Sequence, residues 1–245
     1  MNHPFLEQNS TCRFVPPADL PFSEVDYSDF NFLQHLNLPW FPVELDGFNY
    51  LKMYDEARAV KSRFVEHRAL GTEYGYGKGW KSLCLHGLSE HRTENWERYS
   101  DVAVLGDEAL VPYDFTQASE YCPEITAFLK CAFPFESYQR VRLMLLEPGG
   151  YILPHCDRGQ GLITSITLAL NNPKGCDFIM KSCGVVPLKQ GGDACIIDVS
   201  REHAVFNNSG EDRYHLIIHG NPGRFSQQWR DIVTKSYATW RSSFS

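Results

Sequence analysis

From Tyr138 to His219 the sequence is a succession of short runs of β-forming residues separated by turn residues. Turn signals stand at Pro148-Gly149-Gly150, Asn171-Asn172-Pro173, Gly191-Gly192 and Asn208-Ser209-Gly210. Short strands at this spacing are typical of an antiparallel sandwich or an open barrel. The expected strands are Tyr138–Leu146, Tyr151–Pro154, Leu162–Leu170, Asp177–Lys181, Cys195–Val199, His203–Asn207 and Tyr214–His219.

Helical patterns flank this β-rich region. Apolar residues recur at three- and four-residue intervals over Phe48–Arg68, a second helix is predicted from Pro123 to about Ala132, and an amphipathic helix over Ser226–Tyr237. Residues 1–45 lack a clear period and predict an irregular arm with short strands. We expect one domain over residues 1–245, mainly β with flanking helices: an arm and supporting helices (1–135), a β-core (136–220) and a C-terminal helix (221–245).

Composition excludes several classes of function. The chain has 245 residues and a formal net charge of −7, which argues against a nucleic-acid binder. It has no long apolar run and no basic cluster beside an apolar helix, so no membrane partner is expected. The start is not a secretory signal, and the eight scattered cysteines then predict reduced thiols in a cytoplasmic protein.

The segment Pro154-His155-Cys156-Asp157 carries two metal-ligand types two residues apart, which project to one side of an extended chain. A third ligand is expected from His203. Two histidines and one carboxylate on one face of an octahedron leave three positions open, as in non-haem Fe(II) oxygenases. His215 and His219 also alternate with apolar residues, so either could replace His203.

Arg213 stands ten residues after His203. The intervening residues read as a strand end and a hairpin turn, and an odd-numbered loop would point Arg213 and His203 into one cavity. A guanidinium there can pair with the distal carboxylate of a short dicarboxylic acid whose other end chelates iron.

The stretch Arg140–Gly220 resembles the aspartyl/asparaginyl β-hydroxylase and proline-hydroxylase group of Fe(II)- and 2-oxoglutarate-dependent oxygenases. The matching segments are RVRLMLLEPGGYILPHCD, ITLALNNPKGCDFIM, GDACIIDVSREHAVFNNSGEDR and YHLIIHG. The resemblance implies a double-stranded β-helix (a cupin-like jelly roll), with His155, Asp157 and His203 as ligands and Arg213 as the 2-oxoglutarate anchor. Some members have an arginine nine residues after the first ligand, where this chain has Thr164, so their substrate scheme is not transferred.

Other residues are weaker candidates for the site. Ser165, Thr167 and His215 could bind the co-substrate, although the two hydroxyls also fit ordinary β-propensity and His215 an ordinary hydrogen-bonded histidine. Arg142 could bind a substrate carboxylate or be solvated. Trp80, His86 and Arg158 are further substrate candidates. The glycine-rich run 71–81 reads as a connector at a strand edge or as a flap, with the connector favoured.

These observations predict a 2-oxoglutarate-dependent dioxygenase that hydroxylates an unactivated C–H of an amino acid, free or within a peptide, using O2. One alternative is another oxidative outcome at the same site, such as desaturation or cyclisation; halogenation is disfavoured because Asp157 occupies the position that a halide needs. The other alternative is a metal-binding cupin without redox turnover, which would not need Arg213.

Overall fold

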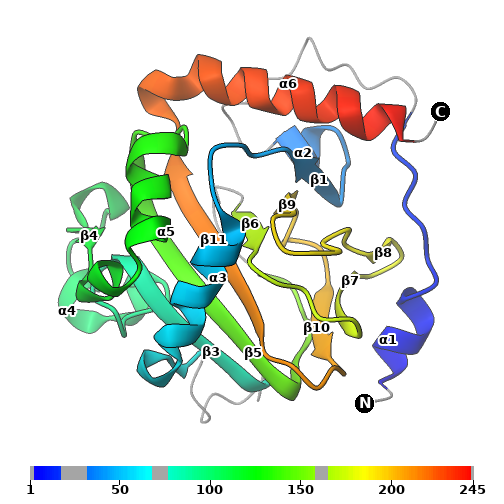
Figure 1. The fold of residues 1–245 in the computed structure, drawn as a ribbon, viewed down its shortest axis with the longest axis horizontal. Coiled ribbons are helices and arrows are strands. Elements are labelled where there is room, and N and C mark those ends of the chain that lie inside the picture. The colour runs from blue at the N-terminus through cyan, green and yellow to red at the C-terminus, as the bar shows by residue number, and fades with distance from the viewer. Residues whose placement is uncertain (1–2, 18–31, 68–76, 158–164, 244–245) are drawn as a thin grey trace.

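The structure is a computed structural model and describes residues 3–17, 32–67, 77–157 and 165–243. Within these residues, eleven strands form one antiparallel sheet in the order β1-β9-β6-β11-β5-β10-β7-β8, while β3 pairs with β5 off this path and also pairs with β2 and β4 (Figure 1). The strands are β1 (Trp40–Val43), β2 (Val65–Glu66), β3 (Gly77–Gly87), β4 (Asp114–Phe115), β5 (Ser137–His155), β6 (Ile166–Ala169), β7 (Cys176–Met180), β8 (Gly184–Val185), β9 (Ala194–Ile197), β10 (His203–Asn207) and β11 (Arg213–Asn221).

Strand β5 joins the two arms of the sheet. Its first part, Ser137–Leu146, pairs with β11, and its last part, Tyr151–His155, pairs with β10. Since β3 pairs with both parts, β10 and β11 must follow each other along the opposite edge of β5. The predicted mainly β fold, a curled antiparallel sheet of the jelly-roll type with helices outside, is confirmed.

Alternation along the strands gives this sheet an inner and an outer face. On β5, Val141, Leu143 and Leu145 belong to the main core on the outer face. Arg142, Met144 and Leu146 face the other way and define the inner face. A second cluster packs Ala169 of β6 and Cys195 of β9 against Met180 of β7, so the inner faces of the two arms contact each other.

The predicted strands Tyr138–Leu146 and Tyr151–Pro154 are one continuous strand, because its partners continue past the glycines. Gly149 has a φ of +70°, and a Cβ on Gly150 would lie 2.7 Å from the carbonyl oxygen of Glu147 and 2.8 Å from that of Lys78. These glycines therefore permit a tight bend and a close approach of β3, which a sequence reading takes for a turn.

Helices cover the outer face of the sheet. In Figure 1, α3 crosses in front of the β5–β11 pair with α5 beside it, and α6 lies across one end near β1. Their side chains join the main core with Met53 of α3, Ile125 of α5 and Trp229 of α6. The helices are α1 (Pro4–Asn9), α2 (Phe32–His35), α3 (Tyr50–Ala59), α4 (Ser100–Ala103), α5 (Pro123–Ala127) and α6 (Ser226–Ser242), with a π-helical turn at Phe128–Ala132 and 3-10 turns at Lys61–Arg63, Trp96–Arg98, Glu108–Leu110, Gln117–Tyr121 and Gly223–Phe225.

The N-terminal part contributes more to the sheet than the sequence indicated. The helix predicted over Phe48–Arg68 ends at Ala59, and Val65–Glu66 pairs with β3 instead. Residues 77–81 of the glycine-rich run are strand β3, and residues 71–76 lie outside the described residues. Among the residues that the structure describes, the helices are too short or too polar to cross a bilayer. None of the eight cysteines forms a disulfide.

The hairpin predicted between His203 and Arg213 is absent. Residues 208–212 instead connect two strands that lie end to end along β5. The buried side chain of Asn207 holds this connection: its Nδ2 donates to the carbonyl oxygens of Leu146 at 2.9 Å and Glu211 at 2.8 Å, and its Oδ1 accepts from the Ser209 backbone N–H at 3.1 Å. Asn207 thus ties the bend of β5 to the start of β11.

We expect Asn207→Ala to lower the free energy of unfolding by about 2–4 kcal/mol, because it leaves the buried Leu146 carbonyl and the part-buried Glu211 carbonyl without this donor. Urea unfolding measures the change. The exposed neighbour serves as the control, and Asn208→Ala should cost less than about 1 kcal/mol. Equal losses in the two variants would show that Asn207 does not organise the connection.

Candidate active site

Three side chains with metal-binding atoms converge at the end of β5. His155 is its last residue, Asp157 follows two residues later, and His203 begins β10. One ligand atom from each lies within 4.8 Å of the other two. Nε2 of His155 is 3.6 Å from Oδ1 of Asp157, and the two imidazole centroids are 4.4 Å apart. The sequence-predicted triad therefore occupies one place.

A β-bulge contributes to this convergence. His203 pairs with His155 and Val205 pairs with Ile152, so β5 uses one more residue than β10 over this interval. The extra residue puts His155 on the same face as Ile152, which packs with Val205 on the inner face. Without the bulge, strict alternation would place His155 on the opposite face. Asp157 lies beyond the strand, where its backbone N–H donates to the carbonyl of Val199 at 2.9 Å.

Backbone carbonyls orient both imidazoles. Nδ1 of His155 lies 2.7 Å from the Leu153 oxygen, and Nδ1 of His203 lies 2.8 Å from the Arg201 oxygen. A carbonyl oxygen only accepts, so each Nδ1 carries the proton and the lone pair of the neutral ring is on Nε2. Such a second contact fixes the tautomer and orientation of a metal-binding histidine.

The surroundings of the triad are unequal. The side chain of His155 is 7% exposed and that of Asp157 is 35% exposed. His203 is buried and stacks on Phe178 at 5.3 Å between ring centroids. The histidines are therefore fixed from inside the sheet, while the carboxylate lies nearer the solvent. Two imidazole nitrogens and one carboxylate oxygen match the donor set that binds Fe(II) and leaves positions for other ligands.

Arg213 and His215 form a buried pair on β11. Nη2 of Arg213 donates to Nδ1 of His215 at 2.7 Å. Since arginine keeps its charge, this imidazole is the acceptor, and its proton is on Nε2. Burial lowers the pKa of both groups, and the Arg213 charge lowers that of His215 further. Neither Nε of Arg213 nor Nε2 of His215 has a hydrogen-bond partner in the described part of the chain.

The pair lies on the inner face. Arg213 pairs in register with Leu146, and Leu146 packs with Cys176 and Val205 in an apolar cluster. Arg213 and His203 are thus on one face, as expected, although the predicted hairpin was not the reason. The buried Thr167 is also on this face, one strand away from His215. Ser165 is buried just before β6.

The geometry separates the three histidines that competed for the third ligand position. His203 forms the cluster of metal-binding side chains together with His155 and Asp157. His215 is engaged with Arg213, and His219 Nε2 lies 3.2 Å from Nη2 of Arg142.

Two of the substrate candidates lie on or near the inner face. Arg142 is buried there on β5. The Trp80 ring centroid is 6.5 Å from that of His155 and 4.3 Å from that of His67. Sequence reasoning missed His67, whose Nδ1 contacts the Ser82 hydroxyl at 2.8 Å and the Thr93 hydroxyl at 3.2 Å. No motif marks these residues, because strand pairing and a returning loop bring them together.

The expectation for His86 needs correction. A bulge between Cys84 and His86 makes His86 the partner of Val141, which belongs to the outer core. Its ring packs edge-on against Phe115 at 4.9 Å and lies 5.7 Å from Tyr138. Burial lowers the pKa of this imidazole. His86 is therefore away from the triad, and Arg158 lies outside the described residues.

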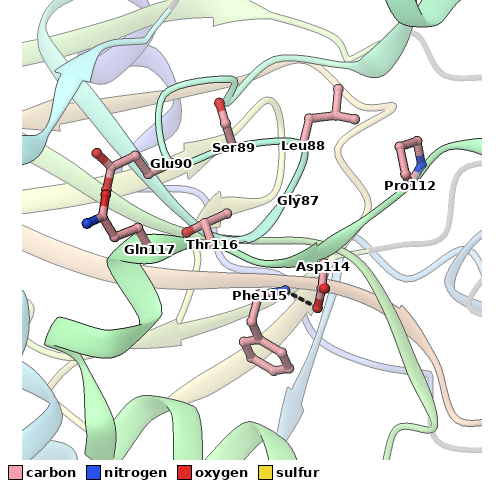
Figure 2. A pocket seen from close by; sticks show the side chains of 9 residues that line it. All are labelled: Gly87, Leu88, Ser89, Glu90, Pro112, Asp114, Phe115, Thr116 and Gln117. Carbon is pink, nitrogen blue, oxygen red and sulfur yellow. Dashed lines mark hydrogen bonds between the residues drawn. The ribbon is translucent and has the colours of Figure 1, made fainter.

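A separate pocket of about 330 Å³ lies where β3 leads into the following loop (Figure 2). Its lining is mixed, with Glu90 and Gln117 on one side and Asp114 and Phe115 on another. Glu90 already forms a two-point contact with Arg63, at 2.8 and 3.0 Å. None of the triad or of the Arg213–His215 pair lines it.

A curled antiparallel sheet with two histidines and an aspartate converging on its inner face is the frame of an Fe(II)- and 2-oxoglutarate-dependent dioxygenase. The family model described as aspartyl/asparaginyl beta-hydroxylase matches residues 48–221. The chain belongs to this family, and it is a 2-oxoglutarate-dependent dioxygenase with Fe(II) as its metal. The resemblance inferred from the sequence is confirmed.

Solved structures with a related course of the chain include a prolyl 4-hydroxylase of Pseudomonas putida, at 13% identity and a TM-score of 0.43, covering 79% of this chain and 97% of that one. Another is an oxidoreductase of the 2OG-Fe(II) oxygenase family from Burkholderia pseudomallei, at 12% identity and a TM-score of 0.41, covering 86% and 94%. No curated protein is significantly similar in sequence.

Proposed function

We propose that His155, Asp157 and His203 bind Fe(II), and that Arg213 and His215 bind the distal carboxylate of 2-oxoglutarate. The enzyme then hydroxylates an unactivated C–H of an amino acid, free or within a peptide. With O2, the bound iron and co-substrate supply the oxidant for this hydroxylation and release succinate and CO2. The protein supplies positions, hydrogen bonds and an environment with little water.

The observation that carries this proposal is the Arg213–His215 pair. A buried cation without an anionic partner is costly, and so is a buried imidazole N–H without an acceptor. Nε of Arg213 and Nε2 of His215 are two such donors, and they belong to side chains that contact each other. On this proposal, a carboxylate of the co-substrate accepts from this pair, and charge-assisted hydrogen bonds of this kind are strong. Thr167, and Ser165 before it, could add hydroxyl donors from the neighbouring strand.

The triad contributes the other half of the argument. Its two imidazoles are held with Nε2 as the lone-pair atom, so binding a metal requires no change of tautomer. Apolar side chains lie on the inner face beside both groups: Leu146 is the register partner of Arg213, and Val205 is two residues from His203. Such a lining keeps water away from a reactive centre and leaves the polar ends of a short dicarboxylate as its specific contacts.

We also propose that residues 1–245 act as one oxygenase domain, since β1 and β3 from the N-terminal part pair directly with strands of the β-core. The unpaired cysteines support a reducing compartment, and we assign the enzyme to the cytoplasm.

An anaerobic titration tests the site. Fe(II)-loaded protein should develop a visible charge-transfer band when 2-oxoglutarate is added, with saturation at one equivalent. 2-Oxobutyrate, which chelates but lacks the distal carboxylate, should require at least about 30-fold more ligand. Absence of the band, or equal affinity for the two acids, would overturn the assignment. A screen for a +16 mass shift across amino acids and peptides then identifies the hydroxylated substrate.

A further inference from the structure

A second buried arginine lies on the inner face, apart from the co-substrate pair. Arg142 of β5 is 8% exposed and pairs in register with Ile217 of β11 and Cys84 of β3. Its position on the inner face follows from the alternation that places Val141 and Leu143 in the outer core. The solvated position left open by the sequence is therefore excluded.

Within the described part of the chain, this guanidinium is held by neutral acceptors alone. Nη1 donates to the Thr93 carbonyl at 3.0 Å, and Nη2 to His219 Nε2 at 3.2 Å. The acceptor role belongs to the imidazole because arginine has no acceptor atom. Nε has no hydrogen-bond partner within the described ranges. The side chain is thus fixed in direction while its charge has no contacting carboxylate.

Arg142 is also close to the metal end of the site. Arg142 is five residues before the bend at 147–150, and His155 is five residues after it. The two residues are therefore at similar distances from the bend, on arms whose inner faces contact each other. Burial lowers the pKa of Arg142, the nearby Arg140 adds to this, and the Asp157 and Glu94 carboxylates partly oppose it. The carboxylate of the triad is therefore within electrostatic range of this guanidinium without contacting it.

We propose that Arg142, oriented by His219 and the Thr93 carbonyl, binds a carboxylate of the substrate beside the metal. This inference rests on the proposed function and adds a substrate class: molecules that carry a carboxylate near the carbon to be oxidised. Distinct anchors for the two carboxylates explain why the inner face holds two buried arginines. Arg213 is near the bend, because its register partner on β5 is Leu146. Arg142 precedes Leu146 by four residues, so it lies farther from the bend along the same arm.

The carboxylate can come from two sources, and the probes distinguish them. One series pairs free L-amino acids with their α-amides. The other pairs capped tripeptides that have a central Asp or Glu with the matching Asn or Gln peptides. Each probe is titrated anaerobically into protein loaded with Fe(II) and saturating 2-oxoglutarate, and the change in the chelate band gives Kd.

We expect at least one carboxylate probe to bind wild-type protein more tightly than its neutral counterpart. In Arg142→Gln its Kd should rise about 10- to 150-fold, the range for loss of a hydrogen bond to a charged group, while the neutral counterpart changes less than about threefold. Arg140→Gln is the control, because it removes an equal charge from a half-buried side chain two residues away. Arg142→Lys retains the charge without the planar donor set and should lose affinity partially.

The outcomes separate the two proposals. If wild-type protein gives no chelate band, the proposed function fails. If the band forms but no carboxylate probe is preferred, or the preference survives in Arg142→Gln, the Arg142 assignment is overturned and the co-substrate site stands. The wild-type preference needs no variant, so it tests the assignment even where Arg142→Gln does not fold. A preference within the amino-acid series assigns an α-carboxylate, and one within the peptide series assigns a side chain.

Discussion

His203→Ala is expected to abolish turnover and to weaken Fe(II) binding more than about 100-fold, since even the residues that orient a ligand cost 10- to 100-fold when removed. His203 supplies one of the two imidazole nitrogens of the His155–Asp157–His203 cluster, and its side chain is buried. Isothermal titration with Fe(II) under anaerobic conditions measures the affinity, and succinate release measures turnover.

The control for this variant is an imidazole on the surface. The side chain of His91 is 52% exposed and contacts Glu90, so His91→Ala should bind Fe(II) as the wild type does. His155→Ala should behave as His203→Ala does, because each imidazole supplies one ligand atom. Retention of stoichiometric high-affinity Fe(II) by both variants would show that the metal binds elsewhere.

Arg213→Met should weaken 2-oxoglutarate binding by about 2–5 kcal/mol, which is roughly 30-fold or more, because the distal carboxylate loses its buried partner. The affinity for Fe(II) should change little, since Arg213 does not belong to the His155–Asp157–His203 cluster. The chelate band measured at increasing 2-oxoglutarate concentrations gives the affinity.

The same variant should have an opposite effect on stability. Without co-substrate, Arg213→Met removes a buried charge that has no anionic partner, so its Tm should equal or exceed that of the wild type. Adding 2-oxoglutarate and Fe(II) should raise the wild-type Tm and leave that of the variant nearly as it was with Fe(II) alone. A variant that is less stable without ligand and still binds 2-oxoglutarate normally would assign Arg213 a structural role.

The sequence predicted the short-range features of this protein well. Strand β10 has the predicted bounds, His203–Asn207, and the turn residues Asn208-Ser209-Gly210 follow directly at its end. His155 and Asp157 are close in sequence, so their proximity follows from local geometry. The helix over Ser226–Tyr237 was also predicted, and the structure extends it to Ser242.

Features that depend on pairing between distant segments were not accessible. The strand character of Gly77–Gly87 is hidden by its glycines, which are needed where β3 approaches β5: a Cβ on Gly77 would be 2.3 Å from the Tyr151 oxygen. The same reason explains the misread loop at 208–212, whose course is decided by Asn207 contacts to β5. The outer position of His86 was not visible in the sequence, because a bulge reverses alternation and single-sequence patterns do not reveal bulges.

The course of β5 has a consequence for co-substrate selection. One strand ends in His155 and also holds Leu146, the register partner of Arg213. The bend between them therefore fixes the span between the proposed iron ligands and the proposed carboxylate anchor. On the proposed assignment, that span selects the co-substrate by the length of its carbon chain. A five-carbon diacid matches it, while the four- and six-carbon homologues would be one methylene too short or too long. Adding one residue to the bend would not simply lengthen this span, because the side chains of β5 beyond the bend would then point to the opposite face of the sheet.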